Sequence, residues 1–315
     1  MVRTLFFELN LKKIMKKQIT YLSIFLISLT TLQGQVEQQS LPTSEEISNR
    51  RTSFNLDEIK VRWKKAALEN CTGVPCVVAP SFTCGTSTVS DIDGNAYNTV
   101  LIGTQCWTTS NLKVTKYTDG TGIPLDATGS STGNTSTAWE LLTTGAYTIY
   151  GNVGSSGANA TNYGFLYNWY AVSGIITSGG TSSKKLCPTG WHVPTDSEWT
   201  ALDTHLGGFS VAGGMMKSTG TTLWTSQSSG TNNSSGFTAL PGGFRSSYDG
   251  EFRYIRDRAY FWTATANGTP NSLTNSSLVS PLPEAWNRNL EHNVNVRYRT
   301  SVAVTNGYSV RCLRD

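Results

Sequence analysis

The segment KKLCPTGWHVPTDSEWTALDTHLGG, residues 184–208, decides the fold because it carries the clearest helix signal in the chain. Thr195 suits the N-cap, and Glu198 stands three residues later, as in a capping box. Gly207 suits the position just after a helix end. The large apolar residues fall on one helical face: Trp199, Leu202 and Leu206. The segment therefore predicts a helix over residues 196–206.

The sequence around this helix is typical of short strands and turns. The segments that follow it are GFTALPGGFRSSYDGEF (236–252), AYFWTATANG (259–268) and VRYRTSVAVTNGYSVRCLRD (296–315). Residues 118–160 are mostly Gly, Thr, Ser and Ala, which predicts long surface loops anchored by a few large residues: Trp139, Tyr147 and Tyr150. We expect an α+β fold of short antiparallel strands, one or two helices and long Gly/Ser/Thr-rich loops.

The segment TVSDIDGNAYNTVLIG, residues 88–103, contains an Asp-Gly-Asn turn between two runs of strand-forming residues. This pattern predicts a β-hairpin. Its DIDGN stretch also resembles the start of a calcium-binding loop. Ile102 stands where such a loop has its bidentate Glu, so the hairpin is the favoured interpretation.

The composition suits a folded, loop-rich protein. Charged residues make up 15% of the 315 residues, against roughly 25% in ordinary globular domains. The nine Trp, thirteen Tyr and eleven Phe can fill a core, which argues against disorder. The net charge of +4 is small, and several Lys and Arg lie near the N-terminus, so no nucleic-acid-binding surface is indicated.

The N-terminus resembles a secretory leader. Lys16 and Lys17 precede the apolar run from Tyr21 to Leu32, and the small residue Gly34 follows. We interpret residues 1–34 as a signal peptide whose true start is Met15, with an uncleaved anchor as the alternative. Export then places the protein outside the cytoplasm, secreted, on the outer cell surface or in the periplasm, with no stable transmembrane span in the mature chain.

Residues 35–83 form a polar N-terminal segment with one short helix signal. Asn55 suits an N-cap, and Trp63 falls on the apolar face of a predicted helix over residues 56–69. The helix also carries several Lys and Arg. It packs on the next module through Trp63 or, alternatively, lies on a membrane surface.

The six cysteines are an even number in a chain with an export signal, which indicates disulfides. Fifteen pairings are formally possible. We expect three: Cys71 with Cys76, Cys84 with Cys106, and Cys187 with Cys312. Zinc is the rival interpretation, but the cysteines lack paired CxxC spacing, so no metal is expected.

Six ordered blocks between about Val89 and Asp315 resemble one known family: DIDGNAYNTVLIGTQCWTTSNL, YGFLYNWYAV, LCPTGWHVPTDSEW, GFTALPGGFR, YFWTAT and GYSVRCLRD. They resemble the Fibrobacter succinogenes major paralogous domain, common in secreted proteins of Bacteroidetes and Fibrobacteres. The resemblance implies that residues 84–315 form a domain of the C-type-lectin-like superfold, which also includes formylglycine-generating enzymes and retroelement-encoded variable receptors. It implies no established activity. Thr108 and Thr109 depart from the Met-containing pattern of the family.

Three activities of related or convergent folds were tested against the residues. Calcium-dependent lectins use a Trp-Asn-Asp strand, whereas this chain has Trp286-Asn287-Arg288, and Arg288 replaces the carboxylate. An oxidase of the formylglycine-generating type needs a reactive cysteine pair. Cys187 and Cys312 are the candidates, but they are better explained as a structural bridge. A Ser-His-Asp hydrolase is not indicated, because the sequence has no GxSxG motif.

Two of the three histidines have a structural interpretation. We expect His192 to be a hydrogen-bonded residue beside Trp191, and His205 to lie late in the helix. His292 is unassigned. Trp262 is expected in the core.

Aromatic and Arg-rich loops of the C-terminal half suit sugar stacking or protein contacts. The candidate ligand-binding residues are Tyr248, Asp249, Arg253, Tyr254, Arg256, Trp286, Asn287 and Arg288. We therefore expect a non-catalytic binding module for glycans or partner proteins, without a cofactor. The alternatives are an oxidase-like enzyme of the formylglycine-generating type and a structural envelope component with no discrete ligand.

Overall fold

The computed structural model describes residues 81–127, 137–174, 184–268 and 283–315. These residues belong to one compact unit, Pro80–Asp315. The expected signal peptide (1–34), the helix expected over 56–69 and the pair Cys71–Cys76 lie outside the described residues. Within the described ranges, no helix has the length and apolar character needed to cross a membrane.

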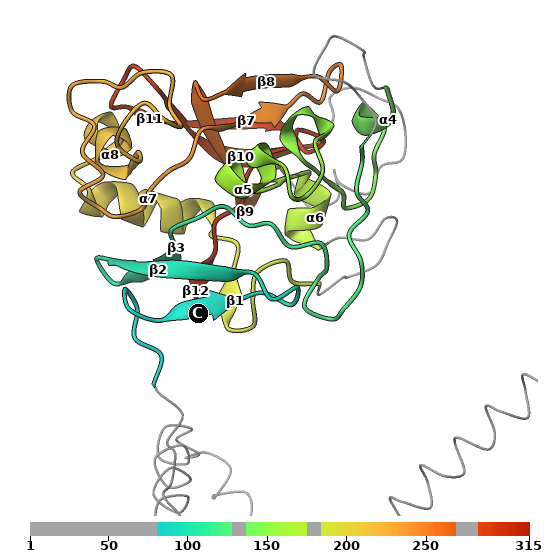
Figure 1. Ribbon diagram of the computed structural model, residues 1–315, viewed down its shortest axis with the longest axis horizontal. Helices are drawn as coiled ribbons and strands as arrows, with labels where there is room; N and C mark the ends of the chain where they lie inside the picture. The colour runs from blue at the N-terminus through green and yellow to red at the C-terminus, as the bar shows by residue number, and fades with distance from the viewer. Residues whose placement is uncertain (1–80, 128–136, 175–183, 269–282) are drawn as a thin grey trace, which may run out of the picture. The chain divides into compact units, whose positions relative to one another are not determined.

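The first and last strands of the unit share one five-stranded sheet (Figure 1). Its order is β1-β2-β3-β12-β6, formed by β1 (Thr88–Ser90), β2 (Ala96–Ile102), β3 (Gln105–Thr108), β12 (Leu313–Arg314) and β6 (Trp191–His192). The predicted hairpin is confirmed as the antiparallel pair β1–β2. Asp91 closes its turn, because Oδ1 accepts from the backbone N–H groups of Asp93 (3.0 Å) and Asn95 (2.9 Å).

A second five-stranded sheet has the order β11-β10-β9-β7-β8. Its strands are β7 (Gly242–Arg245), β8 (Phe252–Ile255), β9 (Arg258–Asn267), β10 (Glu284–Glu291) and β11 (Arg297–Ala303). Neighbours pair antiparallel, except that β7 runs parallel to β9. A two-stranded sheet joins β4 (Tyr147–Thr148) to β5 (Leu166–Tyr167). The expected α+β class of mainly short antiparallel strands is confirmed.

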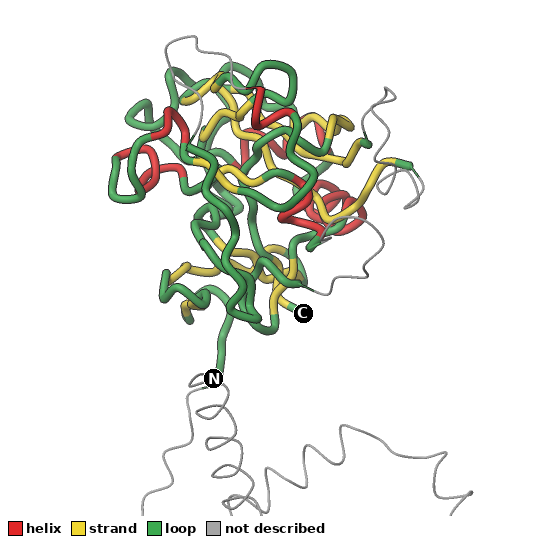
Figure 2. Tube along the Cα trace, turned by 90° about the vertical axis from the view of Figure 1, so that its right-hand side faces the viewer, coloured by secondary structure: helices red, strands yellow, loops and turns green. Residues whose placement is uncertain are grey.

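The helices are short, and much of the described trace is loop (Figure 2). They are α4 (Thr137–Glu140), η1 (Tyr150–Asn152), α5 (Ala158–Tyr163), α6 (Trp169–Ser173), α7 (Asp196–His205) and α8 (Phe209–Met216). The expectation of one or two helices was therefore too low. Residues 118–160 contain more regular structure than expected, since α4, β4 and η1 lie within them, whereas the expected anchor Trp139 is indeed fully buried.

Helix α7 confirms the helix expected over 196–206 and lies between the two large sheets (Figure 1). The capping box is complete: Thr195 Oγ1 accepts from the Glu198 N–H (3.3 Å), and Glu198 Oε2 accepts from the Thr195 N–H (2.7 Å). The Trp199 ring packs 4.9 Å from the ring of Trp107 in β3 and 5.6 Å from that of Phe261 in β9. One aromatic side chain thus connects both sheets through their buried faces.

His192 is a hydrogen-bonded residue, as expected. Its Nδ1 lies 2.6 Å from Asp315 Oδ1, and its Nε2 lies 2.9 Å from Glu198 Oε1. The imidazole therefore links β6, the last residue of the chain and α7. Trp262 is fully buried, which confirms its place in the core.

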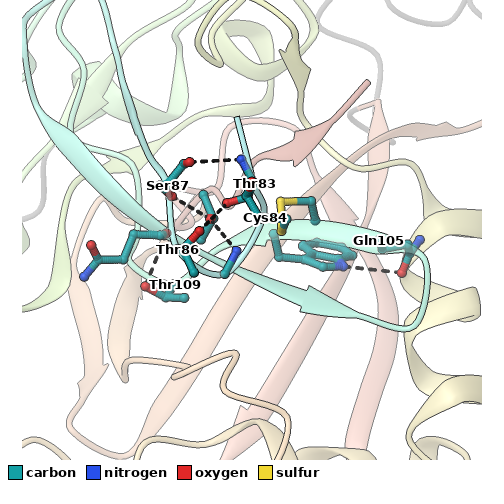
Figure 3. Close-up of a disulfide and its surroundings, with 11 residues drawn as sticks. Thr83, Cys84, Thr86, Ser87, Gln105 and Thr109 are labelled. Atoms are coloured by element: carbon teal, nitrogen blue, oxygen red, sulfur yellow. Dashed lines mark hydrogen bonds between the residues drawn. A yellow bond between two sulfur atoms is a disulfide. The ribbon is translucent and has the colours of Figure 1, made fainter. Parts of the chain in front are cut away.

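Two of the expected disulfides are confirmed, Cys84–Cys106 and Cys187–Cys312. Figure 3 shows the first, where Cys84 lies in a turn in which Ser87 Oγ accepts from the Thr83 N–H (2.9 Å). The second closes 125 residues and is buried at both ends. Cross-links of this length restrict the unfolded chain strongly, by about 5 kcal/mol in the chain-entropy model.

Arg311, one residue before the second bridge, is fully buried. Its Nη1 donates to the carbonyls of Thr108 and Phe237 (2.8 Å each), its Nη2 to the carbonyl of Thr238 (2.7 Å), and its Nε to Asn111 Oδ1 (2.8 Å). The guanidinium also stacks 4.6 Å from the Phe237 ring centre. Burial lowers the pKa of Arg311 to about 9. These neutral oxygens and π faces solvate a charge that burial would otherwise disfavour.

We expect Arg311→Met to destabilise the protein by about 3 kcal/mol or more, because the substitution leaves several buried carbonyls without a donor. Urea unfolding followed by Trp fluorescence measures the loss. Arg314→Met is the matched control, since Arg314 is exposed and its guanidinium lies over the Phe82 ring, 4.2 Å from the ring centre. An equal loss in the two variants would contradict the assigned role of Arg311.

Candidate binding surface

The turn between β7 and β8 presents an exposed aromatic ring on an ordered backbone. The Ser246 N–H donates to the Glu251 carbonyl (2.8 Å), and the Ser247 N–H donates to Asn306 Oδ1 (3.1 Å). The Tyr248 N–H donates to Ser246 Oγ (3.1 Å), yet the Tyr248 residue is 85% exposed. The backbone is therefore fixed while the side chain stays in water.

The same hairpin carries an ion pair, and its Asp249 follows Tyr248 directly in the chain. Arg253 Nη1 donates to Asp249 Oδ1 (2.9 Å), Nη2 donates to Asp249 Oδ2, and Nη2 also contacts Glu251 Oε2 (3.0 Å). The hydrogen bond from Arg253 is the main cause that lowers the pKa of Asp249 to about 2. The Asp249 carboxylate is therefore ionised and oriented at neutral pH.

Tyr254 projects from β8 with an unusual backbone. Its φ is 62°, in the left-handed region that a bulky residue rarely adopts. The ring stacks on Phe244 with centroids 5.9 Å apart, and the Arg258 guanidinium lies 4.5 Å from its centre. Arg258 in turn pairs with Glu291 at 3.3 Å. The strained residue is thus held from two sides while Tyr254 remains 44% exposed.

These residues form one group, which we call the hairpin site: Tyr248, Asp249, Glu251, Arg253 and Tyr254. Its base is aromatic and rigid. Phe244 packs 5.0 Å from Tyr260, Tyr260 packs 4.9 Å from Tyr308, and Tyr308 packs 4.6 Å from Trp262. Through Phe244, the Tyr254 ring is thereby continuous with the core.

Two further candidates lie apart from the hairpin site. Arg256 donates through Nη2 to the Thr221 carbonyl (3.2 Å). Trp286 lies in β10, beside the edge strand β11, whereas β8 forms the other edge of this sheet. Its ring lies 3.4 Å below the Arg299 guanidinium, whose Nε donates to Asp196 Oδ1 (3.0 Å). The structure therefore does not bring the eight candidates together on one surface.

Asn287 and Arg288 correct the sequence-based prediction, because both are fully buried in β10 rather than in a surface loop. Asn287 Nδ2 donates to the Thr300 carbonyl (2.8 Å). Arg288 Nη1 pairs with Asp196 Oδ1 at 2.6 Å, at the start of α7. The Arg288 guanidinium is thus engaged in a buried ion pair and does not face solvent. In the described ranges, no cluster of three or more His, Cys, Asp or Glu side chains is arranged to hold a metal ion.

The sequence did not indicate Phe244, Arg258 and Glu291, which support Tyr254. The only available signal was the alternation in β9, which places Arg258, Tyr260 and Trp262 on one face. Arg258 follows Tyr254 by four residues in the chain, whereas Phe244 reaches Tyr254 because β7 pairs with β8.

Polar groups on the 224–231 loop find partners within the chain. The buried Lys217 ammonium donates to Ser228 Oγ (3.1 Å) and to three main-chain carbonyls, the shortest bond being to Val294 (2.7 Å). Burial lowers the pKa of Lys217 to about 8. His292, unassigned from sequence, has its Nδ1 2.6 Å from Ser226 Oγ. These contacts tie the loop to the segment after β10.

The geometry defines a disulfide-bonded α+β domain with an exposed, ion-paired aromatic hairpin. The model of the Fibrobacter succinogenes major domain matches residues 100–314. The chain therefore belongs to this family, which confirms the resemblance seen in the sequence. No curated protein and no solved structure matches the chain.

We expect Arg253→Met to raise the pKa of Asp249 from about 2 toward its ordinary value of 3.8. In the native protein the stabilisation from this carboxylate is present above pH 3.8 and is lost as the pH falls through about 2. Carboxyl ¹³C NMR during an acid titration measures the pKa. Glu251→Gln is the control, and a larger shift there than in Arg253→Met would contradict the assignment.

Proposed function

We propose that this protein is an exported, non-catalytic binding module that engages its ligand at the hairpin site. The observation that carries the proposal is the ordered turn that presents Tyr248 at 85% exposure beside the Asp249–Arg253 pair. A fixed backbone reduces the entropy lost on binding, and Tyr and Arg are the residue types most often found at binding hot spots.

The scaffold in this proposal is C-type-lectin-like. Support comes from the first and last strands in one sheet, from α7 packed between two sheets, and from the bridge that ties Cys187 to the C-terminal segment. The family resemblance adds to this support. In such a scaffold, the binding residues lie on loops and hairpins held by a rigid core.

The domain plan remains a proposal: a leader over 1–34, a polar segment over 35–83 and the binding domain over 84–315. The leader pattern and the two disulfides support export, since disulfides persist in oxidising compartments. The oxidase alternative has less support, because Cys187 and Cys312 are buried and joined to each other, which leaves neither as a thiol.

We expect export to leave a mature chain that begins near Gln35 with all six cysteines oxidised. Intact-mass and peptide mass spectrometry of protein from fractionated native cells measures both features, with alkylation before lysis to trap free thiols. An intact leader on cytosolic protein, or free thiols at Cys187 and Cys312, would contradict export.

We expect the purified protein to bind at least one member of an array of immobilised polysaccharides and surface proteins. The double variant Tyr248→Ala/Arg253→Met should lose this binding, because it removes the exposed ring and the bidentate donor of the hairpin site.

Phe209→Ala is the matched control, since Phe209 is an exposed aromatic residue on α8, outside the hairpin site. Thermal unfolding of each variant checks that the fold is kept. The proposal fails if no immobilised molecule binds, or if a bound ligand is retained equally by the native protein and the double variant.

A further inference from the structure

We infer that the hairpin site takes a neutral glycan and does so without calcium, an inference that rests on the proposed function. The exposed ring, the set of hydrogen-bond acceptors beside it and the charge of the site together select this ligand class.

The first feature is the Tyr248 ring. It is 85% exposed, and no ring or cation contact is recorded for it among the described residues. The negative face of an aromatic ring attracts the partly positive C–H groups on one face of a pyranose. The turn holds the tyrosine backbone through Ser246 and Asn306, so the ring is already presented when a sugar arrives.

The second feature is the surplus of oxygen acceptors beside the ring. Each carboxylate has about four lone-pair directions. Asp249 accepts hydrogen bonds from Arg253 and from the Glu251 N–H, and Glu251 Oε2 accepts one from Arg253. Within the described residues no group donates to Glu251 Oε1, so this oxygen can accept from a sugar hydroxyl. Oriented carboxylates on the same turn as an exposed aromatic ring match a ligand that carries hydroxyl donors around a C–H surface.

The third feature is the charge. The hairpin site with its supporting pair contains two guanidinium groups, Arg253 and Arg258, and three carboxylates, Asp249, Glu251 and Glu291, which leaves one negative charge. Each guanidinium already faces a carboxylate. Within this group an acidic polysaccharide would find no guanidinium without a carboxylate partner, and repulsion would disfavour it. A neutral ligand meets no such penalty.

The apolar area is too small for the core of a protein interface. Among the exposed large hydrophobic residues of the described ranges, Tyr248 and Tyr254 alone belong to the hairpin site. A standard interface needs about 800 Å² on each partner, with a well-packed centre. Two tyrosines suit one or two sugar rings instead.

Calcium is not needed to hold the carboxylates of the site. Arg253 already pairs with Asp249 and with one oxygen of Glu251, so these carboxylates need no bound cation to be stable.

The test is affinity electrophoresis of the full mature chain through gels that contain a neutral polysaccharide (β-glucan, xylan or mannan) or an acidic one (polygalacturonate or alginate). We expect retardation by at least one neutral polymer, unchanged by EDTA. Tyr248→Ala should weaken it about tenfold, a change of about 1.4 kcal/mol. Tyr248→Phe should keep the affinity, because the ring face remains, and Phe209→Ala should have no effect.

Retardation by acidic polymers alone, or loss of binding in EDTA, would overturn this inference. The proposed function would still stand if Tyr248→Ala abolishes the retardation that is observed. Binding to proteins on the array that depends on Tyr248, with no binding to glycans, would likewise overturn this inference and leave the proposed function standing. If neither polysaccharides nor proteins bind, both proposals fail. Thermal unfolding of Tyr248→Ala separates a lost contact from a lost fold.

Discussion

The buried guanidinium of Arg311 is the interaction on which the rest of the structure depends. Its partners are neutral oxygens from two separate parts of the chain: Thr108 and Asn111 at and just after the end of β3, and the loop at Phe237–Thr238. Burying a charge is costly unless hydrogen bonds or an ion pair replace its lost hydration. These two segments and the C-terminal segment that carries Arg311 must therefore stay in place together, and Arg311 makes their arrangement cooperative.

The same short C-terminal segment links this interaction to the hairpin site. Tyr308 packs beneath Phe244 and Tyr260, and the Ser309 main chain bonds to β9 on both sides of Phe261. Arg311 and Cys312 follow within a few residues, and Leu313 completes β12. Because a few consecutive residues serve the first sheet, the core and the base of the site, the exposed tyrosines rest on the most constrained part of the fold. Such support is what a pre-ordered binding surface requires.

Features with local causes were predictable from the sequence. The capping box of α7 and the Asp91 turn are set by residues within a few positions of each other. Helix α8 was missed because no side chain caps it, and its Gly213 and Gly214 are needed for close packing: a Cβ there would meet main-chain or side-chain atoms of the 295–296 segment. The parallel pairing of β7 with β9 was also missed, since it depends on long-range packing that no short pattern records.

The site was only partly predictable, because its residue types are visible in the sequence but their surroundings are not. Residue type alone identified the exposed tyrosines and Arg253. It could not separate Arg253 from Arg288, because arginine forms ion pairs equally well at the surface and in a buried position beside a helix N-terminus. The structure separates them by what surrounds each one. The buried cations Arg288, Arg311 and Lys217 use carboxylate, carbonyl and hydroxyl oxygens of the chain itself, so these oxygens are not available to a ligand. At the β7–β8 turn the carboxylates exceed the cations that face them, and the polar capacity that remains there is directed toward solvent.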